Sequence, residues 1–82
     1  MHVGMLWFDN DERRDLSAKL TRAARHYEAK YGVRPTLCYV NPLMLPEGDT
    51  LIAGLEVRAS NTVLPHHFWL GQHEESEQRS AA

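Results

Sequence analysis

The sequence predicts an α+β domain with the element order β-α-β-β-β, in which a four-stranded mixed sheet carries one helix on one face. One segment has the helical period of apolar residues and recognisable ends, and it lies between two short apolar segments. Because one helix covers only one face of a sheet, the other face needs a partner. We expect a second copy of the chain to bury it, so that the protein is a homodimer. The alternative is a sheet curled enough to cover itself.

The first strand is expected in residues 1–8. Val3, Met5 and Trp7 point to one side of this strand, and Leu6 and Phe8 point to the other. Apolar side chains on both sides are typical of a central strand that is covered on two faces.

The helix is expected from Asp11 to Tyr31. Asp9, Asn10 and Asp11 can each accept a hydrogen bond from the unpaired amides of a first helical turn. The end is marked by Gly32, which adopts a left-handed conformation at little cost, and by a proline three residues later. The apolar residues that share one helical face are Leu16, Leu20, Ala23, Ala24, Tyr27 and Tyr31.

Three further strands are expected after the helix, at 36–40, 51–59 and 63–70, the last interrupted at Pro65. Strand, helix and strand with short connections predict a right-handed crossover between parallel strands. Segment 51–59 alternates apolar and polar residues, which is typical of an edge or half-exposed strand.

The length of 82 residues predicts one domain, 1–71, followed by a polar tail, 72–82, that we expect to be disordered. The single cysteine, Cys38, excludes a disulfide within the chain and suits a buried thiol in a reducing compartment. No long apolar segment and no basic leader with a cleavage site is visible, so we expect a cytoplasmic protein.

Asp9 and Asp11 directly follow an apolar segment, and ligands of α/β units bind at the carboxyl ends of strands. Two carboxylates at this spacing suit a Mg²⁺ ion. The segment 6–11 resembles the first motif of haloacid-dehalogenase-like phosphatases, in which an apolar strand leads into Asp-x-Asp. That resemblance covers six residues, and it implies that Asp9 is a nucleophile and Asp11 an acid/base. The simpler interpretation is that these residues cap the helix.

Two adjacent histidines, His66 and His67, are a second candidate metal site or pH switch. Neighbouring residues of a strand point to opposite faces, so the two could bind one ion only if Pro65 distorted the backbone. The simpler interpretation is one interfacial and one exposed histidine.

A third candidate is Asp49 followed by Glu56, Val57 and Arg58, which is similar to the Asp…Glu-x-Lys signature of restriction-endonuclease-like nucleases. The signature implies a divalent metal held by a pair of strands. Arg58 stands where that family has lysine. The simpler interpretation is an edge strand with solvated Glu56 and Arg58.

Arg14, Arg22 and Arg25 are expected on the helix side opposite the apolar stripe, where they could contact phosphates. The chain has eleven acidic and nine basic residues; three acids and one base fall in 74–82, which leaves eight of each in 1–73. This balance argues against strong nucleic-acid binding. Trp69 is a candidate interface residue, because tryptophan often contributes most to interfaces.

The predicted function is therefore a small homodimeric binding or regulatory module of unknown ligand. The alternative is a small metal-dependent enzyme, phosphatase-like or nuclease-like, that uses Asp9 and Asp11 or His66 and His67 with a divalent metal. The third hypothesis is weak nucleic-acid binding through the basic helix face. No glycine-rich phosphate loop or nucleophile motif is present, which favours binding over catalysis.

Overall fold

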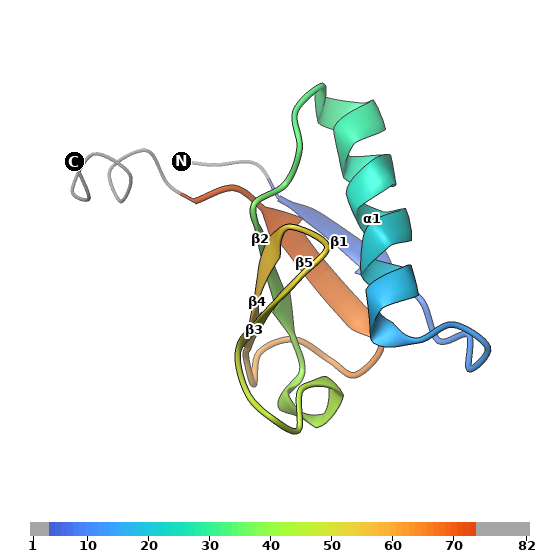
Figure 1. Ribbon diagram of the computed structural model, residues 1–82, viewed down its shortest axis with the longest axis vertical. Helices are drawn as coiled ribbons and strands as arrows, with labels where there is room; N and C mark the ends of the chain where they lie inside the picture. The colour runs from blue at the N-terminus through green and yellow to red at the C-terminus, as the bar shows by residue number, and fades with distance from the viewer. Residues whose placement is uncertain (1–3, 74–82) are drawn as a thin grey trace.

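A computed structural model describes residues 4–73 and confirms the α+β class. One helix, α1 (Leu16–Tyr31), packs on one face of a five-stranded mixed sheet (Figure 1). The strands are β1 (Met5–Phe8), β2 (Leu37–Val40), β3 (Thr50–Ile52), β4 (Leu55–Ala59) and β5 (His67–Gly71), and a short 3-10 helix, η1 (Pro42–Met44), follows β2.

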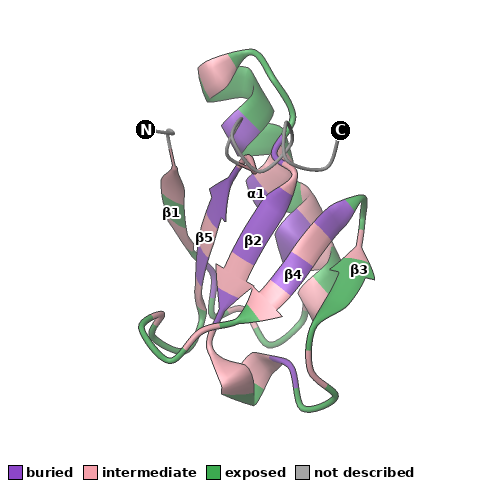
Figure 2. Cartoon of the chain, turned by 90° about the vertical axis from the view of Figure 1, so that its left-hand side faces the viewer, coloured by how far each residue is buried: buried purple, intermediate pink, exposed green. Residues whose placement is uncertain are grey.

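The strand order is β1-β5-β2-β4-β3, with β5 antiparallel to both β1 and β2 and with β2 parallel to β4. β1 and β2 therefore run in the same direction, as predicted for the crossover, but β5 separates them. The prediction that residues 1–8 form a central strand is wrong, because the last strand of the chain returns between β1 and β2. In Figure 2 the sheet lies in front of α1, and β1 and β3 form its two outer strands.

The prediction of four strands is wrong because segment 51–59 forms a hairpin. β3 and β4 pair antiparallel, and Ile52 faces Leu55 at the closed end. Ala53 and Gly54 make the turn with φ values of 53° and 81°. Two successive positive φ angles are typical of a type I′ hairpin turn, for which Asn-Gly is the usual signal. Alanine in the first position hid this turn from the sequence pattern.

The helix ends where predicted but begins later. Gly32 has φ 78° and its amide donates to the carbonyl of Glu28 at 2.8 Å. At the other end Asp15 is the N-cap, and its carboxylate accepts from the Ala18 amide at 2.8 Å. The predicted start at Asp11 is therefore wrong, and the carboxylates of Asp9 and Asp11 do not cap α1.

The hydrophobic core lies between α1 and the sheet. Its most buried residues are no more than 2% exposed: Leu20, Ala23, Tyr27, Cys38, Val40, Leu55, Val57, Phe68 and Leu70. Burial raises the pKa of the Cys38 thiol to about 12, so the thiol stays protonated at neutral pH. Among the described residues, no helix has the length and apolar character needed to cross a bilayer.

The predicted tail is described only as far as His73. The side-chain amide of Gln72 donates to the carbonyl of Arg34 at 2.9 Å. The backbone amide of His73 donates to the hydroxyl of Thr36, also at 2.9 Å. The rest of the predicted tail, 74–82, lies outside the described residues.

Candidate functional site

The sheet face opposite α1, which we name the open face, carries a row of large side chains. Residues alternate between the two faces of a strand, so the core residues on one face leave Leu6, Trp69, Tyr39 and Arg58 on the other. The strand registers pair Leu6 with Trp69, Trp69 with Tyr39, and Tyr39 with Arg58. These four side chains therefore form one row across β1, β5, β2 and β4.

The apolar end of this row is exposed to solvent. Leu6 is 63% exposed and Phe8, two residues further along β1, is 56% exposed, whereas Tyr39 and Trp69 are half-buried. The ring of Phe8 lies 4.9 Å from the ring of His67, its partner on β5. An aromatic and a leucine side chain exposed side by side on a sheet face indicate a contact surface.

The Trp69 ring lies against Gly4, the residue just before β1. A Cβ atom on Gly4 would lie 2.1 Å from Cζ2 of Trp69, so the indole occupies the space that a side chain at position 4 would need. On its other side the indole lies 6.0 Å from the Tyr39 ring, at an interplanar angle of 50°. The indole therefore packs between Gly4 and the Tyr39 ring on the open face.

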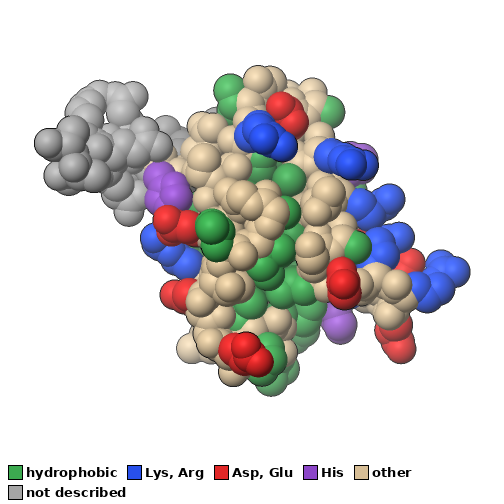
Figure 3. Space-filling view, in the orientation of Figure 1, with side chains coloured by type: hydrophobic (Ala, Val, Ile, Leu, Met, Phe, Trp, Pro, Cys, Tyr) green, Lys and Arg blue, Asp and Glu red, His purple; other side chains and the backbone are tan. Residues whose placement is uncertain are grey.

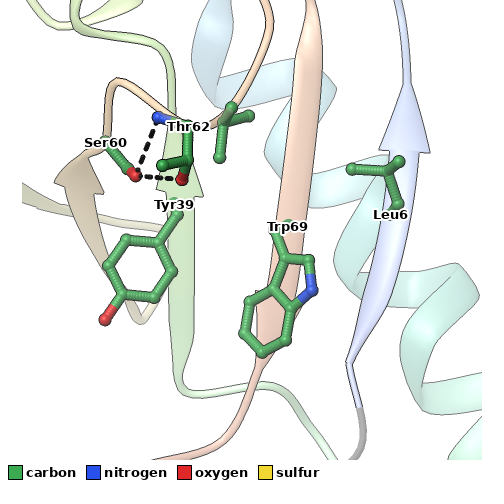
Figure 4. Close-up of a pocket in the computed structure, with 6 residues that line it drawn as sticks. Leu6, Tyr39, Ser60, Thr62 and Trp69 are labelled. Carbon is green, nitrogen blue, oxygen red and sulfur yellow. Dashed lines mark hydrogen bonds between the residues drawn. The ribbon is translucent and has the colours of Figure 1, made fainter.

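A hollow of about 380 Å³ lies beside the two rings. Its lining residues come from three strands and from the segment between β4 and β5: Leu6, Tyr39, Ser60, Thr62, Val63 and Trp69. Figure 4 shows the aromatic rings of Tyr39 and Trp69 with the Ser60 and Thr62 hydroxyls nearby, which are 2.8 Å apart. The lining is mainly apolar, and it suits an apolar side chain of a partner better than a charged group.

The opposite end of the open face is polar. The Arg58 guanidinium donates to the Glu56 carboxylate at 2.6 Å, and Nε2 of His73 lies 3.1 Å from the same oxygen. Hydrogen bonds from His73 and Arg58 lower the pKa of Glu56, so this carboxylate stays ionised. Asp49, the first residue of the nuclease-like pattern, instead accepts from the backbone amide of Ala59 at 3.0 Å. Glu56, Arg58 and Asp49 therefore all make polar contacts with other residues of the fold.

The candidate metal pair, Asp9 and Asp11, is bridged by Arg14. Arg14 donates to Asp9 through Nε at 3.1 Å and through Nη2 at 3.3 Å, and its Nη1 lies 3.3 Å from Asp11. Burial raises the pKa of the Asp9 carboxyl, but hydrogen bonds from Arg14 and the Asp11 amide and the charges of Arg14 and Lys19 outweigh this and lower it. A cation at this position would have to displace the guanidinium.

The two histidines do not converge. His66 is exposed with φ 66°, and its carbonyl accepts from the Asp9 amide at 3.0 Å. His67 lies in β5, and its Nδ1 is 2.9 Å from the carbonyl of Pro65. Within residues 4–73, no group of three or more His, Cys, Asp or Glu side chains is placed to hold one metal ion.

The three arginines predicted to share one helix face do not all lie on the helix. Arg14 precedes α1 and is engaged with the two carboxylates, so it does not share a helix face with Arg22 and Arg25. Arg22 and Arg25 are exposed on α1. Figure 3 shows Lys and Arg side chains along the side of the molecule that α1 and the preceding segment form.

Sequence reasoning included Trp69 among the candidates but missed Leu6, Phe8 and Tyr39 as members of one exposed surface. Their juxtaposition depends on β5 lying between β1 and β2, which no local pattern signals. Gly4 was the available sign, because glycine inside a strand often marks a close approach by another group. No protein-family model, curated protein or solved structure matches the chain.

Proposed function

We propose that the protein is a small homodimeric binding module and that a second copy of the chain covers the open face. One observation carries this proposal: Leu6 and Phe8 are more than half exposed beside the half-buried rings of Tyr39 and Trp69. Exposing these side chains to water is unfavourable, and burying one large apolar side chain contributes about 1.5 to 3 kcal/mol.

The chemistry of the surface suits a protein partner. Tryptophan and tyrosine lie at its centre. These two residue types are common among the interface residues that contribute most to binding. The charged residues, Glu56 and Arg58, lie toward one side and neutralise each other at 2.6 Å. Two copies can therefore meet on this face without bringing unpaired charges of one sign together.

The size of the chain also supports a second copy. A domain of this length buries only about 60% of the surface of its unfolded chain and has a small core. Five strands spaced by about 4.8 Å form a face roughly 24 Å wide. A face of this width suits a contact of modest size, so we expect monomer and dimer to exchange with protein concentration.

Sedimentation equilibrium over a wide concentration range tests the proposal. We expect the native chain to change from monomer to dimer with increasing concentration. Leu6→Lys places a charge in the proposed contact and should weaken the dimer by about tenfold or more. Leu43→Lys is the matched control, because Leu43 is 80% exposed on η1, beyond the end of β2 and outside the open-face row, and should leave the dimer unchanged.

A chain that stays monomeric at high concentration would contradict the dimer. Equal weakening by Leu6→Lys and Leu43→Lys would place the contact elsewhere on the surface.

A further inference from the structure

The outer edge of β1 has backbone groups that no other strand of the described residues meets. β1 is the first strand in the sheet order, and it pairs only with β5. In an antiparallel pair, residues facing each other alternate between pairs that exchange backbone hydrogen bonds and pairs that do not. The Asp9 amide donates to the His66 carbonyl at 3.0 Å, which makes the neighbouring pair, Phe8 and His67, a non-bonded one.

It follows that the backbone N–H and C=O groups of Leu6 and Phe8 point outward, away from β5. The carbonyl of Gly4 points the same way, but it accepts a hydrogen bond from the Tyr31 hydroxyl at 3.3 Å. The open part of the edge is therefore the stretch from Leu6 to Phe8, whose outward backbone groups belong to the same two residues whose side chains are exposed on the open face.

β1 lacks the devices that usually prevent another strand from adding to an edge. Proline, charged side chains and bulges are the common ones, and β1 has the sequence Met-Leu-Trp-Phe in a regular register with β5. The other outer strand, β3, has three residues and lies between Asp49 and the turn at Ala53 and Gly54. The two edges therefore differ in their capacity to accept a strand.

The flank of α1 that lies over β1 is basic. His26 stacks on Trp7, with ring centroids 4.4 Å apart, and the charge of Lys19 lowers the pKa of Asp9 at the end of β1. Arg22 and Lys30 lie one turn before and one turn after His26, and residues four apart share one side of a helix. The only acid of α1, Glu28, lines a hollow on the opposite flank with Arg34 and Leu55.

We propose that the outer edge of β1 binds an extended segment of another protein in which apolar and acidic residues alternate. The segment would add a strand to the sheet through the backbone groups of Leu6 and Phe8. Its apolar side chains would lie beside those of Leu6 and Phe8 on the open face. Its acidic side chains would lie on the helix face, toward the exposed Arg22, His26 and Lys30.

Charge complementarity is the reason for an acidic partner rather than β1 of a second copy. Two copies of β1 joined edge to edge would bring two of these basic flanks together, and β1 carries no acid to offset them. The inference goes beyond the proposed dimer. The outward backbone groups lie in the plane of the sheet, so a second copy on the open face leaves them accessible.

Fluorescence anisotropy with short labelled peptides tests the proposal. One peptide alternates Val and Glu, and its counterpart alternates Val and Lys. We expect the Glu peptide to bind. The Lys peptide should bind at least about tenfold more weakly. Equal binding of the two peptides, or no binding of the Glu peptide, overturns the proposal.

A proline substitution tests the edge itself. Leu6→Pro removes the outward N–H but no bond of the β1–β5 ladder, and proline is tolerated at such edge positions. This variant should bind the Glu peptide about tenfold more weakly. Leu51→Pro is the matched control at the β3 edge. Ile52 and Leu55 form the hydrogen-bonded closing pair of the hairpin, so the backbone N–H of the neighbouring Leu51 points away from β4. Undiminished binding by Leu6→Pro overturns the proposal.

Amide hydrogen exchange on the native chain gives an answer even if Leu6→Pro does not fold. The Glu peptide should slow exchange at Leu6 and Phe8 several-fold and leave Leu51 unchanged. Unchanged exchange at Leu6 and Phe8 overturns the proposal, and so does protection of these amides by protein concentration alone, which would identify a second copy as the added strand. Sedimentation without peptide tests the open-face dimer separately, so the two proposals can fail independently.

Discussion

Arg14 holds Asp9 by two hydrogen bonds, 3.1 Å and 3.3 Å long, at the end of β1. The Asp9 side chain is 5% exposed and that of Arg14 is 33% exposed. The same guanidinium reaches Asp11. Asp9 and Asp11, the two carboxylates predicted as a metal site, therefore form an ion-pair cluster with Arg14 in the segment between β1 and α1.

Asp9→Asn should destabilise the fold by roughly 2 kcal/mol at pH 7, because it leaves a partly buried guanidinium without its charged partner. The folded-state pKa of Asp9 is lowered, so its contribution is present above the unfolded pKa and is lost as pH falls through the folded pKa. The difference in unfolding free energy from the native chain should therefore shrink below about pH 4. Urea unfolding at several pH values measures it, with the exposed Glu12→Gln as control.

Asp15→Ala should destabilise the protein by about 1 kcal/mol, because the first turn of α1 loses the acceptor for the Ala18 amide. Ser17→Ala, an exposed change in the same turn, should have little effect. Thermal unfolding followed by circular dichroism at the helix band compares the two variants. Equal stability of Asp15→Ala and the native chain would show that another residue caps the helix.

Gly4→Ala should destabilise the fold by about 1 to 3 kcal/mol, because the new methyl group overlaps the Trp69 ring. The conflict should disappear when the ring is smaller, so the same change should cost less in a Trp69→Leu background. A double-mutant cycle measures this coupling, for which residues in contact typically give about 0.5 to 3 kcal/mol. Additive effects would mean that Trp69 does not lie over Gly4.

Ala53→Gly should stabilise the protein by roughly 0.5 to 1 kcal/mol, because Ala53 has φ 53° and glycine adopts this conformation without strain. The same substitution in an exposed helix position, Ala29→Gly, should instead destabilise the protein by about 1 kcal/mol. Opposite signs for one chemical change test the hairpin turn specifically. Destabilisation in both variants would contradict the turn geometry.

The end of the helix, which local signals determine, was predicted correctly. Gly32 and Pro35 ended the helix at the right residue because a left-handed cap and a missing amide act within a few positions. The start of the helix was predicted from three candidate caps, Asp9, Asn10 and Asp11, and the residue that caps it, Asp15, was not among them. Arg14 engages Asp9 and Asp11, and the Asp15 carboxylate accepts from the first turn instead.

The candidate site could be predicted only in part because it depends on strand order. An apolar strand such as 5–8 carries the same sequence pattern at the centre of a sheet or at its edge. The insertion of β5 beside β1 is a contact between residues far apart in the chain, and it decides that Leu6 and Phe8 are exposed. The sequence showed that the chain has more apolar side chains than one helix can cover. It did not show which of these side chains would be exposed.

The central claim, that two copies of the chain meet on the open face, is tested most directly by nuclear magnetic resonance. A sample that mixes isotopically labelled and unlabelled chains, at a concentration where the dimer predominates, gives nuclear Overhauser effects between copies only. We predict that these effects arise at Leu6, Phe8, Tyr39 and Trp69. A monomeric sample without such effects, or effects confined to Leu43 and the exposed surface of α1, would contradict the account.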